Sequence, residues 1–366
     1  MRRPGIANLL LVAGSLAVGL LGAELCLRFA SPQIFDIHPR GMYVTDDAVG
    51  YVLTPGFSGI LSRPEFHYHF TINQISQRGA DPRPRKANSF RVVCLGDSFT
   101  WGFGVSEAEM FTVRLEKALA SRFPERDIQV INAGVPGYGT ADQLHFLLSR
   151  ATALDPDLVI LQFLPDNDFI ENRVPARDNA EVREGWLVSK QGGKDPFLGQ
   201  PIWLRAHKWL KDHSHLAKLV SERLGYIAMR AGLMGNLGAT HGEDFTDEDG
   251  RRAIALLQRV AATAKRLGAH TLFLFSPGQT PVVSQSAPPI RAVAVVEQGA
   301  HEAGADFIDL TPIFRARTDR LALYYRLDGH WTAAGHAAVA ESLFDYIVDR
   351  GYLETNHPKD PHPVAR

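Results

Sequence analysis

The sequence contains little cysteine and no excess of charge of either sign. Its two cysteines among 366 residues argue against a disulfide framework, and they lack the spacing of a metal site. The 39 lysines and arginines are balanced by 40 aspartates and glutamates, which gives a formal net charge of −1. Nucleic-acid-binding proteins usually carry a basic excess or a basic stripe. We therefore expect no nucleic acid among the partners.

A long run without charged residues occurs at the N-terminus. Arg2 and Arg3 precede "PGIANLLLVAGSLAVGLLGA", which ends at Ala23. Twenty helical residues cover about 30 Å, the thickness of the hydrocarbon core of a bilayer. The alternative is a cleaved signal peptide, for which this run is long. We expect a single-pass transmembrane anchor at residues 1–30, with a cytoplasmic N-terminus and the rest of the chain periplasmic or extracellular.

The remainder of the chain divides by its sequence patterns and contains no internal repeat. We expect a leader segment at residues 31–88, where the alternation in "EFHYHFTINQ" indicates short strands and "DPRPRKAN" indicates a polar linker. The main domain is expected at residues 89–352 and a C-terminal tail at residues 353–366.

Short apolar runs alternate with helical patterns in the main domain. The runs are "RVVCLG", "DIQVINAG", "DLVILQF", "HTLFLFS" and "ADFIDLT". Strands that alternate with helices form a parallel sheet with helices on both faces. The pattern therefore predicts a three-layer α/β/α fold with a five-stranded parallel sheet. Two candidate capping boxes, Thr140 with Gln143 and Thr246 with Asp249, indicate where two of the helices start.

A long insertion interrupts this alternation at about residues 170–244. Its segment "IWLRAHKWLKDHSHLAKLVSERLGYIAMRAG" combines large apolar residues with more basic than acidic residues. We expect a helical insertion that packs as a cap on its own domain. The alternatives are a lid over the site and a basic amphipathic surface that rests on a membrane.

Ser98 stands where the first of these strands ends, in "GDSFTWG". Ligand sites of parallel sheets gather at the carboxyl ends of the strands. A serine there is commonly a helix cap, but it becomes a nucleophile when a histidine oriented by a carboxylate takes its proton. Asp328 and His330 supply such a pair in "YYRLDGHWTAAGH", just before the last helix. This loop follows the fifth strand, so we expect it at the same sheet edge as Ser98.

Acyl transfer also needs hydrogen-bond donors for a developing oxyanion. "NAGVPGYGT" follows the second strand with glycines that can turn a backbone N–H toward a ligand, and "LPDND" follows the third strand with the amide of Asn167. Asp97 and Asp168 flank the site, and we expect them to make structural hydrogen bonds. Trp101 and Trp331 lie beside these segments and either line a subsite or belong to the core.

These segments carry a resemblance to a known family. In this order, "GDSFTWG", "NAGVPG", "LPDND" and "DGHW" resemble the four sequence blocks of the SGNH (GDSL) hydrolase superfamily, over Arg91 to about Gly351 apart from the insertion. The leader with "GYVLTPGFSG" and the N-terminal anchor resemble a membrane-anchored bacterial branch. The resemblance implies the flavodoxin-like SGNH fold, and it implies no metal or organic cofactor.

The resemblance also assigns roles to residues of this chain, position by position. It implies that Ser98 is the nucleophile and that Asp328 and His330 are the acid–base pair. It further implies an oxyanion hole made of the Ser98 N–H, the Gly137 N–H and the side-chain amide of Asn167.

Two positions depart from the family pattern. Pro165 stands where the third block usually has glycine, and Gly329 alone separates Asp328 from His330 where two residues are usual. The spacing in "DGHW" resembles a variant found in polysaccharide O-acetyltransferase relatives. We expect a serine esterase that acts through an acyl-enzyme on an O-acyl ester, such as an O-acetyl ester, of a glycan or lipid outside the cytoplasm. The alternatives are an O-acyltransferase that acts on a cell-envelope or secreted polysaccharide, and a non-catalytic glycan-binding scaffold.

Overall fold

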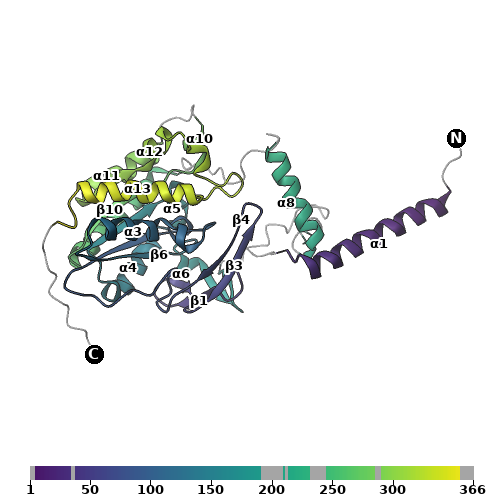
Figure 1. Cartoon of the computed structure of the whole chain (residues 1–366), viewed down its shortest axis with the longest axis horizontal. Helices are drawn as coiled ribbons and strands as arrows, with labels where there is room; N and C mark the ends of the chain where they lie inside the picture. The colour runs from purple at the N-terminus through teal and green to yellow at the C-terminus, as the bar shows by residue number, and fades with distance from the viewer. Residues whose placement is uncertain are drawn as a thin grey trace. The chain divides into compact units, whose positions relative to one another are not determined.

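The computed structural model describes residues 5–33, 38–190, 209–210, 213–230, 245–284 and 290–354. The chain forms two compact units (Figure 1). The first unit comprises Met1–His38 and Gly192–Gly235, and the second, the α/β unit, comprises Pro39–Gln191 and Asn236–Arg366. Parts of two predicted segments lie outside the described residues: 191–208, 211–212 and 231–244 of the insertion, and 355–366 of the C-terminal tail.

A five-stranded parallel sheet forms the centre of the α/β unit, as predicted. Its order is β11-β10-β7-β5-β6, and all neighbouring strands are parallel. The chain runs from β5 to β6 on one side and then to β7 on the other, so the carboxyl ends of β5 and β7 flank a topological switch point. The strands are β5 (Ser89–Gly96), β6 (Asp127–Gly134), β7 (Leu158–Phe163), β10 (His270–Phe275) and β11 (Asp306–Asp309).

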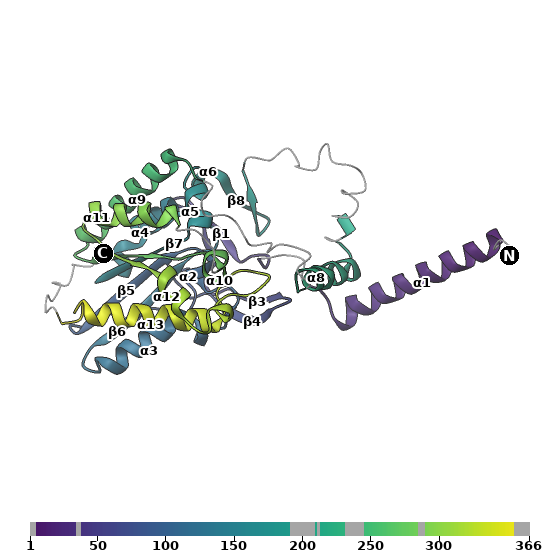
Figure 2. The ribbon, with the colours of Figure 1, turned by 90° about the horizontal axis from the view of Figure 1, so that it is seen from above.

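Helices cover both faces of this sheet and complete the predicted three layers (Figure 2). One face packs on α4 (Thr140–Leu154), α9 (Asp247–Arg266) and α11 (Arg291–Ala303), and the other on α3 (Phe111–Arg122), α12 (Leu310–Ala316) and α13 (Ala333–Asp349). Alternate residues of β5 enter the two clusters: Val93 and Leu95 enter the first, and Val92 and Cys94 the second. Because both faces are covered, all eight residues of β5 are buried.

One of the two predicted capping boxes is present. The Thr246 side chain accepts the Asp249 N–H, and the Asp249 carboxylate accepts the Thr246 N–H, so α9 begins where the pattern predicted. The Thr140–Gln143 capping box is wrong. Thr140 already lies in α4, and its hydroxyl donates to Asp168 at 2.7 Å instead of capping the helix.

The leader segment forms two antiparallel hairpins that belong to the α/β unit. The strands are β1 (Tyr43–Asp46), β2 (Gly50–Leu53), β3 (Ser58–Arg63) and β4 (Phe66–Thr71). Along β4, buried and exposed residues alternate, with Phe66, Tyr68 and Phe70 buried. The Phe70 ring packs edge-on against Trp101, with ring centroids 5.2 Å apart. The alternation that predicted a strand thus buries one face of the hairpin against the segment after Ser98.

Arg78 ties the end of the leader segment to the same region. Arg78 is 2% exposed, and its guanidinium donates to the carbonyl oxygens of Trp101 (3.2 Å), Gly102 (2.5 Å) and Val105 (2.5 Å). The guanidinium also lies 4.6 Å from the centre of the Trp101 ring. A buried cation needs such partners, and here the partners are the backbone carbonyls of one loop. Arg78 therefore fixes the shape of that loop.

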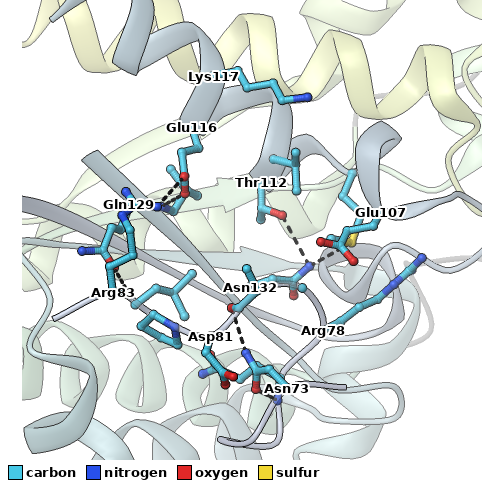
Figure 3. A pocket seen from close by; sticks show the side chains of 18 residues that line it. Asn73, Arg78, Asp81, Arg83, Glu107, Thr112, Glu116, Lys117, Gln129 and Asn132 are labelled. Atoms are coloured by element: carbon cyan, nitrogen blue, oxygen red, sulfur yellow. Dashed lines mark hydrogen bonds and ion pairs between the residues drawn. The ribbon is translucent and has the colours of Figure 1, made fainter. Parts of the chain in front are cut away.

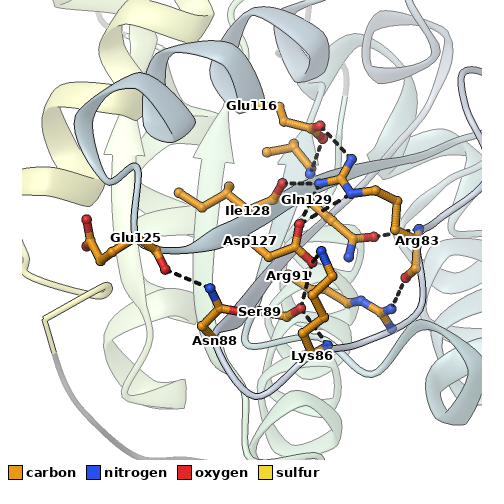
Figure 4. A network of polar contacts seen from close by, with 11 residues as sticks. Arg83, Lys86, Asn88, Ser89, Arg91, Glu116, Glu125, Asp127, Ile128 and Gln129 are labelled. Carbon is orange, nitrogen blue, oxygen red and sulfur yellow. Dashed lines mark hydrogen bonds and ion pairs between the residues drawn. The ribbon is translucent and has the colours of Figure 1, made fainter.

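The segment predicted as a polar linker, residues 81–88, is bonded along the edge strand β6 (Figure 4). The Arg83 guanidinium donates to the Asp127 carboxylate, to Glu116 and, at 2.6 Å, to the carbonyl of Ile128. Arg85 pairs with Asp157 at 2.7 Å. Partly exposed ion pairs contribute roughly 0–1 kcal/mol each. Here Arg83 pairs with both Glu116 and Asp127, and together with Arg85 it ties the segment to the sheet.

Smaller elements connect these parts of the α/β unit. They are α2 (Ser98–Trp101), η1 (Glu107–Glu109), α5 (Pro165–Glu171), α6 (Ala176–Asn179), the hairpin of β8 (Ala180–Arg183) and β9 (Trp186–Ser189), α10 (Gln279–Val283) and η2 (Arg320–Ala322).

The first unit contains α1 (Ile6–Ala30) packed on α8 (His215–Arg230). Within α1, Leu10–Ala30 has a mean hydropathy of 2.1 and no buried share, so it is long and apolar enough to cross a membrane. The Glu24 carboxylate accepts the backbone N–H groups of His215 and Leu216 at the start of α8. This part of the predicted insertion therefore associates with the predicted anchor. The cap, lid and membrane-surface roles of the insertion stay predictions.

Asp142 is a buried carboxyl group that affects stability. It is 1% exposed, and burial raises its pKa to about 7, although it accepts the N–H groups of Ala176 (2.8 Å) and Gly139 (3.3 Å). The ordinary pKa is about 3.9, so between these values the folded state binds more protons than the unfolded state. Its contribution to stability is therefore complete below about pH 4 and is lost as the pH rises through about 7.

We expect the free energy of unfolding to fall by about 2 kcal/mol between pH 5 and pH 7.5 through Asp142, and the Asp142→Asn variant to show a flatter dependence. Urea unfolding at 25 °C across this range measures both slopes. Asp345, which is exposed, provides the control substitution Asp345→Asn. Equal slopes for Asp142→Asn and the wild type would contradict the assignment.

Candidate active site

Ser98 lies directly beyond the carboxyl end of β5, as the first residue of α2. The helix cap is its neighbour Asp97, whose carboxylate accepts the Phe99 N–H at 2.8 Å. Ser98 is therefore not used as the cap, and it is partly exposed, whereas the rest of α2 is buried. Gly96 is required at the end of the strand, because a Cβ there would lie 2.1 Å from the Thr100 hydroxyl oxygen.

His330 and Asp328 reach Ser98 from the loop before α13. Ser98 Oγ lies 2.8 Å from His330 Nε2, and His330 Nδ1 lies 2.5 Å from Asp328 Oδ1. Gly329 between them adopts φ +84°, a left-handed conformation that glycine adopts without strain. This turn lets a single intervening residue place the carboxylate against the imidazole. The unusual spacing in the sequence is therefore compatible with contact among all three side chains.

Two aromatic rings fix the plane of the His330 imidazole. Phe99 and Phe103 each have their ring centroids 4.7 Å from that of His330, at interplanar angles of 34° and 38°. Sequence reasoning did not find this role for either residue. Phe99 stands within the first sequence block and Phe103 just after it, but nothing in the sequence indicates that their rings enclose a histidine more than 200 positions away.

The donors predicted for an oxyanion lie on neighbouring loops of this sheet edge. Gly137 adopts φ +83° after β6, and within the described residues the N–H groups of Ser98 and Gly137 donate to no protein acceptor. Asn167 lies in the first turn of α5, and its Nδ2 donates to Asp97 Oδ2 at 3.2 Å. Pro165 occupies the first turn of the same helix, where a missing N–H costs no hydrogen bond.

Two buried carboxyl groups support this edge. Asp97 and Asp168 are both 0% exposed. Burial raises the pKa of Asp97 to about 6, and burial together with the charge of Asp97 raises the pKa of Asp168 well above its ordinary value. Asp168 accepts the Leu164 N–H and the Thr140 hydroxyl, both at 2.7 Å. Both carboxyl groups therefore make structural hydrogen bonds, and Asp97 also orients the amide of Asn167.

Trp101 and Trp331 belong to the core. Both are 0% exposed, and Trp331 packs against Phe99 with ring centroids 4.9 Å apart. Neither indole ring lines an open subsite. Of the two roles that the sequence left open, both residues therefore have the core role.

A cavity of about 180 Å³ lies elsewhere in the α/β unit (Figure 3). The leader segment, α3 and β6 enclose it, and its labelled side chains include Arg78, Gln129 and Asn132. None of the predicted site residues lines it. The cavity is therefore separate from the edge where Ser98 and His330 meet.

Solved structures resemble this chain only distantly. They include an α/β hydrolase from the metagenome of Lake Arreo, Spain (14% identity, TM-score 0.41, covering 73% of this chain and 97% of that one). A second is a two-domain esterase active on acetylated mannans (15% identity, TM-score 0.42, covering 76% of this chain and 53% of that one). A third is an acetylxylan esterase from Geobacillus stearothermophilus (16% identity, TM-score 0.38, covering 70% of this chain and 94% of that one). No curated protein matches the sequence.

A family-level comparison agrees with the resemblance noted in the sequence. The model of the GDSL-like lipase/acylhydrolase family matches residues 94–338, which is more than half of the chain and includes Ser98, Asn167 and His330. The chain therefore belongs to the GDSL-like lipase/acylhydrolase family, and it is a carboxylic ester hydrolase of that type.

Proposed function

We propose that Ser98, His330 and Asp328 are the catalytic triad of a serine esterase that works through an acyl-enzyme. The observation that carries this proposal is the continuous contact from Ser98 Oγ to His330 Nε2 (2.8 Å) and from His330 Nδ1 to Asp328 Oδ1 (2.5 Å). When Asp328 accepts a hydrogen bond from the Nδ1–H of His330, the Nε2 lone pair faces the serine hydroxyl and can act as a base.

The reaction follows from this arrangement. Ser98 Oγ attacks the ester carbonyl carbon while His330 Nε2 takes the hydroxyl proton. The tetrahedral intermediate collapses, the bond from carbon to the alcohol oxygen breaks, and His330 returns the proton to the departing alcohol. Water then attacks the acyl-enzyme with the same base, which releases the free acid and restores Ser98. Asp328 stabilises the charged imidazole in both steps.

The proposed oxyanion hole consists of the Ser98 N–H, the Gly137 N–H and the amide of Asn167. The two backbone N–H groups have no protein acceptor among the described residues, so they are free to bind a substrate oxygen. One N–H of the Asn167 amide donates to Asp97, which leaves the other for the substrate oxygen. Donors held in place in this way stabilise the charge that develops in the transition state.

We expect a fluorophosphonate probe to label the wild type and not Ser98→Ala. Hydrolysis of p-nitrophenyl acetate should fall at least about 10³-fold in Ser98→Ala and in His330→Ala, because each removes a member of the triad. Ser121→Ala is the matched control, because Ser121 is exposed and its hydroxyl donates to the Lys117 carbonyl. A folded wild type that stays unlabelled would refute the esterase mechanism and support a non-catalytic glycan-binding scaffold.

Substitution of Asn167 tests the oxyanion hole. Asn167→Ala should lower kcat by about 10²- to 10³-fold with little change in KM, because the lost donor acts mainly in the transition state. Asn88→Ala, which removes an exposed amide bonded to the Glu125 carbonyl, is the control. Steady-state kinetics with p-nitrophenyl acetate measure both constants. Unchanged kcat in Asn167→Ala would remove Asn167 from the mechanism.

Transfer of the acyl group to a glycan hydroxyl is the second candidate function. The single residue between Asp328 and His330 favours it, because this spacing resembles polysaccharide O-acetyltransferase relatives. Both functions share the acyl-enzyme and differ in the acceptor. Release of free acid in water alone supports the hydrolase, whereas turnover that requires an added polysaccharide supports the transferase.

We also propose that α1 anchors the chain in a membrane, with the α/β unit outside the cytoplasm. The length and hydropathy of Leu10–Ala30 and the preceding Arg2 and Arg3 support this orientation. When the chain is expressed in a bacterium, it should stay in the membrane fraction after an alkaline carbonate wash and should enter solution with detergent. Protease added to spheroplasts should digest the α/β unit. A mature chain that starts after residue 23 would show cleavage and contradict the anchor.

A further inference from the structure

Glu65 lies at the tip of the hairpin formed by β3 and β4. Arg63 pairs with Phe66 in the ladder, so Pro64 and Glu65 form a two-residue turn. This turn belongs to the leader segment and precedes the span that matches the GDSL family model, residues 94–338. The contacts of Glu65 nevertheless lie on the loop that carries Asp328 and His330.

The Glu65 carboxylate accepts three consecutive backbone N–H groups of that loop. Oε1 accepts the N–H of Arg326 at 2.8 Å, and Oε2 accepts those of Leu327 at 2.8 Å and Asp328 at 2.9 Å. Successive N–H groups that converge in this way bind anions, and charge-assisted hydrogen bonds are about twice as strong as neutral ones. One carboxylate therefore fixes the path of the chain up to Asp328.

The loop has few other contacts that could replace this one. Arg326–His330 lies outside helix and strand, and its ends are joined by the bonds from Tyr325 N–H to the His330 carbonyl and from Gly329 N–H to the Tyr325 carbonyl. Within the described residues, the N–H groups of Leu327 and Asp328 have no acceptor other than Glu65. Without Glu65, these two N–H groups would lose the acceptor that the described part of the chain gives them.

The hairpin that presents Glu65 is itself firmly held. The Phe66 ring packs against Tyr325 and Phe103, with centroids 5.0 Å and 5.5 Å apart. The Tyr68 hydroxyl accepts the Gly104 N–H at 3.1 Å, and the Tyr325 hydroxyl donates to the Gly104 carbonyl at 2.8 Å. The hairpin, the segment after α2 and the Asp328 loop therefore form one connected structure.

We infer that Glu65 is a positioning residue, which holds the Asp328 loop so that Asp328 and His330 meet Ser98. The inference rests on the proposed triad. It means that the leader segment completes the active site from outside the span that defines the family.

Substitution Glu65→Gln keeps the size of the side chain but replaces one accepting oxygen with a donor. We expect kcat for p-nitrophenyl acetate to fall about 10- to 100-fold with KM within about threefold, because the base moves while the substrate contacts stay. Glu65→Asp keeps the charge on a shorter side chain, so its kcat should lie between those of the wild type and Glu65→Ala. Glu116→Gln is the control, since Glu116 also accepts a backbone N–H, that of Val130 in β6 at 2.8 Å.

A double-mutant cycle separates positioning from general destabilisation. If Glu65 acts through the loop that carries the base, Glu65→Gln should cause less than about a twofold further loss in a His330→Ala background. Full activity in Glu65→Gln, or an undiminished loss in the His330→Ala background, would overturn the inference. Circular dichroism verifies that each variant is folded. If Glu65→Gln does not fold, the same measurements are made with Glu65→Asp. Activity retained in Ser98→Ala would instead refute the triad itself, so the two failures are distinguishable.

Discussion

The hydrogen bond between Ser98 Oγ and His330 Nε2 joins residues 232 positions apart. It depends on the buried central sheet, which fixes the positions of both residues. β5 is buried along its whole length, which fixes the point where the strand ends and Ser98 begins. His330 lies just before α13, which packs with α3 on one face of the sheet. Both partners are therefore attached to the same rigid core, and the loop around Gly329 needs to span only the last few ångströms.

Residues of the leader segment contact several loops at this edge of the sheet. Arg78 binds the carbonyls of the loop after α2, the Tyr51 hydroxyl donates to the Pro136 carbonyl beside Gly137, and Glu65 binds the loop that carries Asp328. Each contact reaches a different one of the loops that form the site. The sequence predicted a linker at the polar, proline-containing end of this segment. In the structure, the segment as a whole binds several loops at the carboxyl edge of the sheet.

Buried carboxyl groups beneath the site come at a cost in stability. Asp97 and Asp168 have raised pKa values because burial disfavours their charged forms. In exchange, Asp97 caps α2 and orients Asn167, and Asp168 holds the start of α5 through the Leu164 N–H. Polar networks of this kind are stable only when their members are hydrogen-bonded, and they then define a single arrangement of the side chains.

The sequence by itself determined the fold class, and it predicted the residues of the candidate site. Apolar strands alternating with helices require a parallel sheet, and four short blocks marked Ser98, Gly137, Asn167, Asp328 and His330 as residues at its carboxyl edge. Such signals are local, since they depend on side-chain period and on residues close in the chain. Only the tertiary structure decided which groups meet across distant segments. It placed the Thr140 hydroxyl on Asp168 rather than on its own helix, and Glu65 on a loop 261 to 263 positions away. These contacts arise from packing, because a hydrogen bond between distant residues leaves no periodic trace in the sequence of either partner.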